Sequence, residues 1–468
     1  MGERKPILVT PEEMQAQAHY MDLVNQHTEK PRQYHIVTFG CQMNVHDSEK
    51  LAGMLKAMGA KEAPSKEEAD LVLFNTCCVR DNAERKALGN VLWLKELKKS
   101  RPELMIGVCG CMIQQPGMAE RILSQYRFVD IAFGTHNLHR LPEMLYKVLE
   151  TRHPVVEVCF DENRIAEDVP IQRPNTYQAY LTIMYGCNNF CSFCIVPYVR
   201  GRERSRSAQA IIEEAVQLKE SGVKEIMLLG QNVNSYGNDQ QGELRFPQLL
   251  KELDQLGIPR IRFMTSHPKD LSDELIQVMA DGKHICPHFH LPVQSGNDAV
   301  LKAMNRRYTR EQYLNRVSAL RKAIPNIGLT TDLIVGFPGE TEEQFQDTLS
   351  LVEEVRYDAA FTFIYSPRSG TRAADMAGQV TKEVAADRIQ RLIALQESSI
   401  RAVHESLIGM NDLVLVENLS KRDQKQVSGK GMRNITISFP GSPQDIGRII
   451  PVRITSSGSN TLRGERIE

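Results

Sequence analysis

The stretch GCNNFCSFCIVPYVRGRERSRS, residues 186–207, places three cysteines within eight residues and follows them with four arginines. Cys187, Cys191 and Cys194 come directly after AYLTIMY, an apolar run that is typical of a buried strand. A structural zinc site uses four protein ligands, and this loop offers three. Iron–sulfur clusters are also held by Cys thiolates, and a four-iron cluster held by three of them keeps one iron open to another ligand. The spacing therefore favours an iron–sulfur cluster, with zinc as the alternative.

Outward from this loop, strand patterns and amphipathic helix patterns alternate from residue 176 to residue 402. The alternation predicts a partial or complete β/α barrel, in which the carboxyl ends of the strands carry the chemistry. Polar residues follow the predicted strands: Gln231, Asn232, Ser266, His267, Gln294 and Asp332. They are candidates for cofactor or substrate binding, or they bond one another between neighbouring loops. Gly336, in GFPGE, either lets the backbone approach a ligand or forms a tight turn.

Residues 33–150 show the same alternation and predict a separate parallel α/β domain. Cys41, Cys77 and Cys111 each lie just past the end of a predicted strand. Because the carboxyl ends of parallel strands share one edge of a sheet, the three cysteines could meet there and bind metal. Each alone could equally be a core thiol. Cys78 and Cys109 are interpreted as core residues, since strand alternation points Cys78 away from Cys77.

Three further segments complete the predicted organisation. Residues 1–32 are an extension of unknown role, and residues 151–175 form a polar, proline-bounded linker that holds a structural Cys159. Residues 403–468 show short strands separated by turn residues and predict a small all-β domain. One loop of that domain is basic: it contains Lys421, Arg422, Lys425, Lys430 and Arg433. A solvated loop is the plain interpretation, and an RNA-facing loop is the alternative.

Composition limits the class of protein. The chain has 468 residues, of which 41% are hydrophobic and 25% charged, as in soluble globular proteins of several domains. Its formal net charge of −1 requires any nucleic-acid surface to be a local patch. We find no apolar run long enough to span a membrane and no targeting segment, so the cytosol is the expected compartment. Ten cysteines in a cytosolic chain indicate metal binding or catalysis rather than disulfides.

The CxxxCxxC spacing in the first strand–helix loop of a barrel is the signature of the radical-SAM superfamily. From residue 33 onward the chain resembles the radical-SAM methylthiotransferases. The segments GCQMN, NTCCVRDNAE and CGCMIQQPG resemble the part of that family that binds a second iron–sulfur cluster, with Cys41, Cys77 and Cys111 at the matching positions. The C-terminal domain resembles a TRAM domain, an RNA-binding β-barrel. The expected architecture is therefore α/β: a parallel N-terminal domain, a partial TIM-type barrel and a TRAM-like barrel.

Three subfamilies share this pattern. They modify N6-isopentenyladenosine in tRNA, N6-threonylcarbamoyladenosine in tRNA, or an aspartate of a ribosomal protein. The segments LLGQNVNSYG and RFMTSHP resemble the first subfamily, while HLPVQSGNDAVLKAMNRRYTREQY and TTDLIVGFPGETEEQF are shared more widely. The resemblance therefore implies methylthiolation of isopentenyladenosine, with the threonylcarbamoyl substrate as the alternative and the ribosomal protein as the less favoured one. A non-enzymatic iron–sulfur sensor is a further rival.

The resemblance also implies a division of labour. A 4Fe-4S cluster on Cys187, Cys191 and Cys194 cleaves S-adenosylmethionine to a radical that removes the hydrogen from C2 of the adenine at tRNA position 37, beside the anticodon. The second cluster, on Cys41, Cys77 and Cys111, donates sulfur that a further S-adenosylmethionine methylates. Cofactor binding is expected from Gln231, Asn232, Asp332 and Gly336.

Partners follow from the same resemblance. The anticodon stem-loop of tRNA is the expected substrate, with phosphate contacts from Arg200, Arg202, Arg204 and Arg206. A surface strip of salt bridges is the plain alternative for these arginines. An external electron donor is also expected, together with a possible carrier of iron–sulfur clusters or sulfur. We expect no membrane and a monomer.

Overall fold

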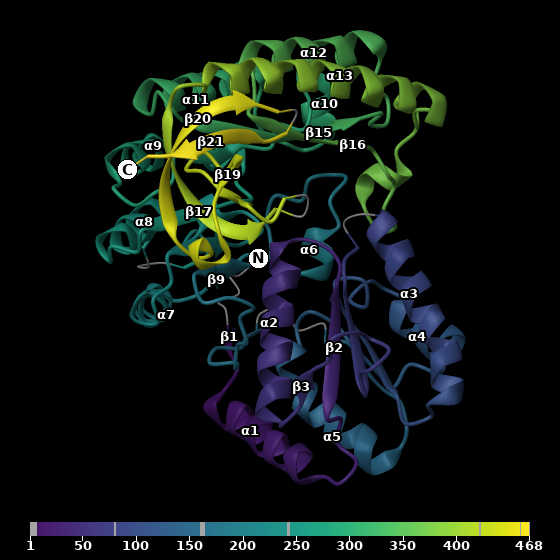
Figure 1. Cartoon of the computed structure of the whole chain (residues 1–468). Helices are drawn as coiled ribbons and strands as arrows, with labels where there is room; N and C mark the ends of the chain where they lie inside the picture. Colours follow the sequence, from purple (N-terminus) through teal and green to yellow (C-terminus); the bar gives the residue numbers. More distant parts are fainter. Residues whose placement is uncertain are drawn as a thin grey trace. The chain divides into compact units, whose positions relative to one another are not determined.

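The computed structural model describes residues 7–78, 81–159, 164–240, 244–420, 423–458 and 460–467 (Figure 1). The chain divides into two compact units, which are described separately. The first comprises Met1–Pro174, Met184–Asn188 and Cys194–Arg206. The second comprises Asn175–Ile183, Asn189–Phe193 and Ser207–Glu468. Among the described helices, none has the length and apolar character that crossing a lipid bilayer requires.

A six-stranded sheet, in which each pair of neighbouring strands is parallel, forms the centre of the first unit, in the order β3-β2-β4-β5-β6-β7. The strands are β2 (Gln33–Thr38), β3 (Lys61–Glu62), β4 (Leu71–Thr76), β5 (Met105–Gly110), β6 (Ile131–Phe133) and β7 (Val155–Glu157). The helices are α1 (Pro11–Gln26), α2 (Gln42–Ala57), α3 (Asp81–Ser100), α4 (Met118–Gln125) and α5 (Leu141–Thr151). The predicted parallel α/β fold is confirmed.

Strand alternation sorts the core of this unit into two layers. On β4, Leu71 and Leu73 pack with residues of α2 and α5, whereas Val72 and Phe74 pack with residues of α3 and α4. All four side chains are fully buried, because both faces of a parallel sheet are covered by helices. Figure 1 shows α3 and α4 on one side of β2 and its neighbours, with α1 and α2 on the other.

The segments predicted as an extension and a linker carry more structure than expected. In the extension, α1 begins with a capping box between Thr10 and Glu13. The segment predicted as a linker supplies β7 to the main sheet and β8 (Arg164–Ile165), which pairs with β1 (Ile7–Leu8). A three-residue strand is too short to show an alternating pattern within a polar segment, so the prediction missed it.

The second unit contains two three-stranded parallel sheets, in the orders β13-β12-β9 and β14-β15-β16. An isolated parallel bridge pairs Ile261 on β13 with Ile285, which shortly precedes β14, and so links the two sheets. The strands are β9 (Gln178–Thr182), β12 (Glu225–Leu229), β13 (Arg260–Phe263), β14 (His288–His290), β15 (Gly328–Val335) and β16 (Ala359–Ile364). This order is that of a partial β/α barrel, as predicted.

Helices follow the barrel strands in the predicted alternation. They are α7 (Ala208–Glu220), α8 (Phe246–Gln255), α9 (Asp273–Asp281), α10 (Asp298–Ala303), α11 (Arg310–Ala323), α12 (Glu342–Val355) and α13 (Lys382–Ser406). Thr309 and Thr341 form capping boxes with the glutamines three residues further on, which fixes where α11 and α12 begin.

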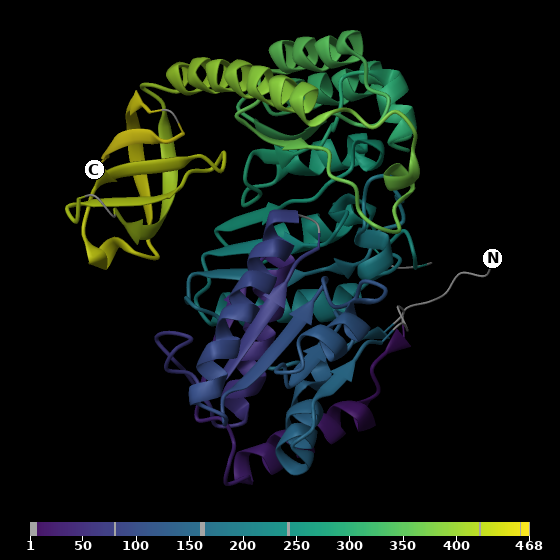
Figure 2. The same cartoon turned by 90° about the vertical axis from the view of Figure 1, so that its right-hand side faces the viewer.

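After α13 the chain forms a closed five-stranded barrel in the order β17-β18-β19-β21-β20. The strands are β17 (Asn411–Leu419), β18 (Gln426–Lys430), β19 (Thr436–Pro440), β20 (Ile449–Ser457) and β21 (Leu462–Arg466). Alternate apolar side chains fill its interior, among them Val427, Ile437 and Phe439. Figure 2 shows this barrel at the end of α13. The predicted all-β C-terminal domain is confirmed.

Buried charges join this small barrel to the amino ends of the β/α barrel strands. Glu225 Oε2, at the start of β12, lies 2.9 Å from Arg260 Nε and 2.8 Å from Arg262 Nε. Arg260 Nη2 donates to the carbonyl oxygen of Lys430 at 2.8 Å, and Arg262 Nη2 donates to that of Gly431 at 2.6 Å. The loop between β18 and β19 is thus attached at the edge of the β/α barrel opposite to the carboxyl ends of its strands.

Candidate active site

In the second unit, Cys191 lies against a buried arginine. Arg306 Nη1 is 3.4 Å from Cys191 Sγ, while its Nε donates to the Tyr308 hydroxyl at 3.0 Å and its Nη2 to the Pro292 carbonyl oxygen at 2.6 Å. The guanidinium is therefore fixed on three sides. Arg306 therefore places a fixed positive charge beside the Cys191 sulfur.

The sequence around Cys191 is held by the loop that follows α10. Ser192 Oγ donates to the carbonyl oxygen of Ala303 at 2.8 Å, and Asn305 Nδ2 donates to that of Phe190 at 2.9 Å. Phe193 packs against the core cluster that contains Met304. The two segments, more than a hundred residues apart in sequence, therefore position this cysteine together.

Buried polar atoms are gathered at the carboxyl ends of β12 and β13. Asn232 Nδ2 donates to Asp270 Oδ2 at 2.8 Å. Within the described part of the chain, Asn232 Oδ1, Ser266 Oγ and His267 Nε2 are buried and have no hydrogen-bond partner. Buried polar atoms are normally satisfied, so unpaired ones at a strand edge indicate a place for a polar ligand. These residues fit a ligand with ammonium, carboxylate and ribose groups, such as S-adenosylmethionine.

The other predicted cofactor-binding residues lie on or beside the same strand edge. Gln231 follows β12 and is half-buried. Asp332, on β15, has its Oδ1 atom 3.6 Å from His290 Nε2. The Gly336 amide, just past β15, donates to Glu340 Oε2 at 2.7 Å, and that carboxylate is held by buried Arg388 at 2.9 Å. Cofactor binding by these residues stays a prediction.

Replacing Gly336 by alanine separates its two predicted roles. Gly336 has φ of +71°, and a Cβ there would lie 3.0 Å from Ala385 Cβ. We expect a loss of about 1–2 kcal/mol in stability from the left-handed backbone alone. If Gly336 also borders the cofactor, the affinity for S-adenosylmethionine, measured by equilibrium dialysis, will fall beyond what the small loss of folded protein explains. An unchanged dissociation constant would show that Gly336 serves the turn and does not border the cofactor. Gly370→Ala, with φ of +83° and open space around its Cβ, is the matched control.

In the first unit, the three predicted cysteines follow three adjacent strands. Cys41, Cys77 and Cys111 come after the carboxyl ends of β2, β4 and β5, which are neighbours in the sheet. The Cys111 amide donates to the carbonyl oxygen of Thr76 at 3.0 Å. A Cβ on Gly40 would lie 2.7 Å from Cys77 Cβ, so glycine is what lets the turn before Cys41 pass so close to Cys77. The expectation that these strand ends share one edge is confirmed.

In the structure, the thiols at this edge contact neighbouring protein groups. Cys41 Sγ is 3.3 Å from Asn44 Oδ1. The Cys78 thiol hydrogen-bonds Cys111 and lowers its pKa, and the nearby guanidinium of Arg200 acts in the same direction. Cys78 and Cys109 are buried, as predicted. Cys78 nevertheless meets this set, because the chain leaves strand geometry after Thr76 and alternation no longer holds. Among the described residues, no three Cys, His, Asp or Glu side chains lie close enough to hold one metal ion. Binding of a cluster by the predicted cysteines stays a proposal.

The arginine strip differs from the prediction of phosphate contacts. Arg200, Arg204 and Arg206 are buried, and only Arg202 of the four is exposed. Arg206 Nη2 pairs with Glu167 Oε2 at 2.6 Å. Arg204 lies over the ring of Tyr185 and belongs to β11 (Arg204–Ser205), which pairs with β10 (Met184–Tyr185). Side chains with internal partners and little exposure do not fit RNA phosphates, so that prediction is kept for Arg202 alone.

The basic residues of the small barrel also differ from one another in their surroundings. Lys421 and Arg422 lie outside the described residues. Lys425 is exposed and fits the prediction of RNA binding, which stays a prediction. Lys430 Nζ donates to Thr436 Oγ1 at 3.0 Å, and Arg433 pairs with buried Asp358. Contrary to the prediction, these last two residues stabilise the barrel and its attachment.

Arg306 and Asp47 were not among the predicted site residues, and Arg200 was predicted in another role, as a phosphate contact. Arg306 and Arg200 contact cysteine sulfurs, and Asp47 contacts Arg200. Asp47 lies within α2, which begins at Gln42. The available signal was the run HDSE in a helix: four polar residues in a row cannot all face solvent, and all four are buried.

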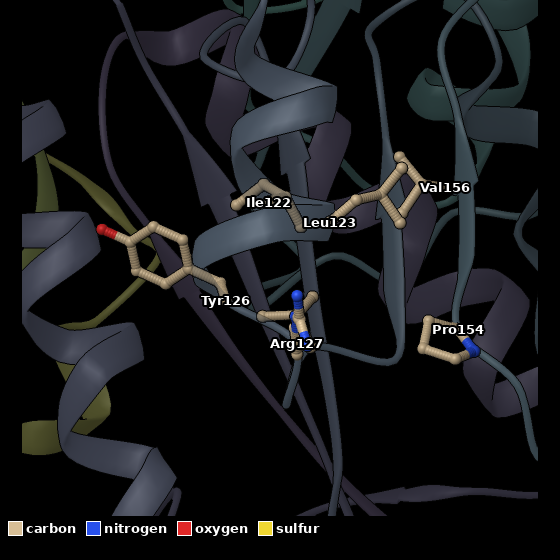
Figure 3. Close-up of a pocket in the computed structure, with 7 residues that line it drawn as sticks. Ile122, Leu123, Tyr126, Arg127, Pro154 and Val156 are labelled. Atoms are coloured by element: carbon tan, nitrogen blue, oxygen red, sulfur yellow. The ribbon is translucent and has the colours of Figure 1, made fainter.

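A small pocket of about 200 Å³ lies elsewhere in the first unit (Figure 3). It is lined by side chains from the end of α4 and from β7, including Ile122, Tyr126 and Val156. Because these residues lie near the amino ends of β6 and β7, the pocket is at the edge of the sheet opposite to Cys41, Cys77 and Cys111. It is mainly apolar and contributes nothing to the candidate sites.

Three family models match the chain. The Radical SAM superfamily matches residues 181–352, the Uncharacterized protein family UPF0004 matches residues 33–134, and the TRAM domain matches residues 406–467. A solved structure of the radical S-adenosylmethionine methyltransferase TsrM from Kitasatospora setae, with cobalamin and a 4Fe-4S cluster bound, is similar with a TM-score of 0.53. It is 15% identical, and the match covers 73% of this chain and 77% of that one, so it shows the fold alone. Fold and family models define a radical-SAM enzyme with a C-terminal TRAM domain.

Two relatives are similar over their whole length. A tRNA-2-methylthio-N(6)-dimethylallyladenosine synthase from Acetivibrio thermocellus is 50% identical over 99% of this chain and 98% of its own. One from Alkaliphilus oremlandii is 49% identical over 100% of both. The chain belongs to the family of these synthases. Its membership indicates an iron–sulfur cluster and S-adenosylmethionine as cofactors.

Proposed function

We propose that this protein is the enzyme that adds a methylthio group to C2 of N6-isopentenyladenosine, also called N6-dimethylallyladenosine, at position 37 of tRNA. The observation that carries the proposal is the identity of about 50%, over essentially the full chain, with synthases named for that product. The TRAM match over residues 406–467 supports an RNA substrate, and we assign phosphate contacts to Lys425 and Arg202, which are exposed. The anticodon stem-loop is the part of the tRNA that carries the modified base.

We assign Cys187, Cys191 and Cys194 to one 4Fe-4S cluster and Cys41, Cys77 and Cys111 to a second. When bound, these clusters and S-adenosylmethionine supply the radical and sulfur chemistry. The residues of the chain hold and shield them. Arg306 fixes a positive charge at Cys191, and the unpaired atoms of Asn232, Ser266 and His267 offer hydrogen bonds to the polar groups of S-adenosylmethionine. An external electron donor, a possible carrier of iron–sulfur clusters or sulfur, and a monomeric, cytoplasmic enzyme complete the proposal.

A direct assay tests the proposed function. The protein is reconstituted anaerobically with iron and sulfide, then incubated with dithionite, S-adenosylmethionine and isopentenylated anticodon stem-loop RNA. Mass spectrometry of the digested RNA is expected to show 2-methylthio-N6-isopentenyladenosine. Cleavage of S-adenosylmethionine without an RNA adduct would contradict the substrate assignment, and threonylcarbamoylated RNA is then the substrate to try.

A further inference from the structure

The buried ion pair between Arg200 and Asp47 is not explained by substrate binding. Arg200 is 5% exposed and Asp47 is 7% exposed, and their Nη2 and Oδ2 atoms are 2.7 Å apart. Taking such a pair out of water is costly, so a buried pair is weak evidence for stability and needs another reason. The reason lies on the other side of the guanidinium, where Arg200 Nε is 3.2 Å from Cys111 Sγ.

The geometry leaves Arg200 little freedom to do anything else. One edge of its planar group is held by Asp47, and its Nε–H is directed to the sulfur. Arginine stays protonated at any ordinary pH, so this contact is permanently cationic. The short helix α6 (Val196–Val199), which carries the chain into Arg200, is seated in the same place, because Ile195 and Val199 pack in one buried cluster with Cys78 and Cys111.

We infer that Arg200, held by Asp47, is a positioning residue for the second cluster: it orients Cys111 and sets how strongly negative charge is stabilised on the group that Cys111 binds. The inference rests on the proposed function, since it requires a cluster on Cys41, Cys77 and Cys111. Hydrogen bonds to the ligand sulfurs and nearby charge are what set the potential of an iron–sulfur cluster. Residues that orient metal ligands in this way affect metal affinity without touching the metal.

The position of Arg200 in the chain gives this contact its significance. Cys194, the last cysteine of the first motif, directly precedes Ile195, and Arg200 follows six residues after Cys194. One short segment therefore begins at a ligand of one proposed cluster and ends on the sulfur of a ligand of the other. Arg200, the first of the four arginines expected to bind RNA, therefore belongs to the surroundings of the proposed second cluster.

The test isolates the second cluster in the full-length protein. A parent variant, Cys187→Ala/Cys191→Ala/Cys194→Ala, removes the first set of ligands and is reconstituted anaerobically with iron and sulfide. Arg200→Gln and Arg200→Lys are then introduced into it, and iron content, the electron paramagnetic resonance spectrum of the reduced protein and its midpoint potential are measured. Arg127→Gln, which removes an exposed arginine near the opposite edge of the sheet, is the matched control.

We expect Arg200→Gln to make reduction at least tenfold less favourable, which for a one-electron couple is about 59 mV towards more negative potential. Arg200→Lys is expected to recover part of the shift, because it keeps the charge but loses the fork that reaches both partners. The control should leave the potential unchanged. If the parent binds iron but its potential and spectrum are the same with glutamine at position 200, the inference about Arg200 is wrong. If the parent binds no iron, the assignment of the second cluster fails, and the inference with it.

Arg200→Gln alone leaves Asp47 buried without its partner, which could impair folding. The double variant Arg200→Gln/Asp47→Asn avoids this, because it removes both charges together. Since Arg200 touches the sulfur, we expect the negative shift to persist in the double variant. A potential equal to that of the parent would overturn the inference there too.

Discussion

Replacing Cys191 by alanine is expected to reduce methylthiolation to the level found without enzyme. Cys191 is the middle ligand of the proposed radical cluster, and two remaining thiolates cannot hold a four-iron cluster that needs three. Reconstituted protein should therefore contain about four iron atoms fewer per chain than the unmodified enzyme. Production of 5′-deoxyadenosine from S-adenosylmethionine should vanish together with the RNA product.

Iron content makes this result specific. Cys159→Ala is the matched control, because Cys159 lies outside both sets and the substitution keeps the backbone carbonyl oxygen that accepts a hydrogen bond from Gln114. The control should keep its full iron content and activity. A Cys191→Ala protein that still cleaved S-adenosylmethionine would show that the radical cluster is held by other residues. Loss of all iron rather than about half would show that the two clusters do not assemble independently.

The sequence could predict where the cysteines lie relative to the strands, because strand ends follow from local patterns. A run of apolar residues shows where a strand ends, and the parallel arrangement then brings Cys41, Cys77 and Cys111 to one edge. The barrel strands and their following polar residues, such as Asn232 and Asp332, were predictable for the same reason. Periodicity and turn residues carry this information within a short window.

The burial of several charged residues could not be predicted, because their partners lie far away in the chain. The alternation RGRERSRS is typical of an exposed strip, yet Arg200 is paired with Asp47, which lies 153 residues earlier. Arg206 is paired with Glu167 in a segment predicted as a linker. A charged residue is buried only when a counter-charge meets it in three dimensions, and no local pattern records that meeting. The same reason explains why Arg433 was expected to face RNA but pairs with Asp358.

The attachment of the TRAM barrel depends on Glu225 in the same way, and Glu225→Gln is expected to cost about 3–5 kcal/mol. The change keeps the size of the side chain but removes the carboxylate that lies 2.9 Å from Arg260 Nε and 2.8 Å from Arg262 Nε. Both guanidiniums are 2% exposed or less, and both hold carbonyl oxygens of the loop between β18 and β19. Weakening them should loosen the small barrel as well as the base of the β/α barrel.

Urea unfolding followed by circular dichroism, together with limited proteolysis, measures this effect. We expect a lower midpoint and faster cleavage between α13 and β17. Glu220→Ala, an exposed residue at the end of the nearby helix α7, is the control and should change neither. A loss below about 1 kcal/mol, typical of an exposed pair, would mean that the charges are not desolvated as the structure has them.

The dependence of this stabilisation on pH provides an independent check. Burial alone would raise the pKa of Glu225, but Arg262 and Arg260 outweigh it and lower the pKa below its ordinary value of 4.5. The native state therefore binds the proton less readily than the unfolded chain, and stability from this carboxylate is complete above pH 4.5 and falls as the pH drops through the lowered pKa. The difference in unfolding free energy between the unmodified protein and Glu225→Gln should accordingly be constant near neutral pH and shrink only in acid. A difference that shrank as the pH rose would contradict the ion pair as its source.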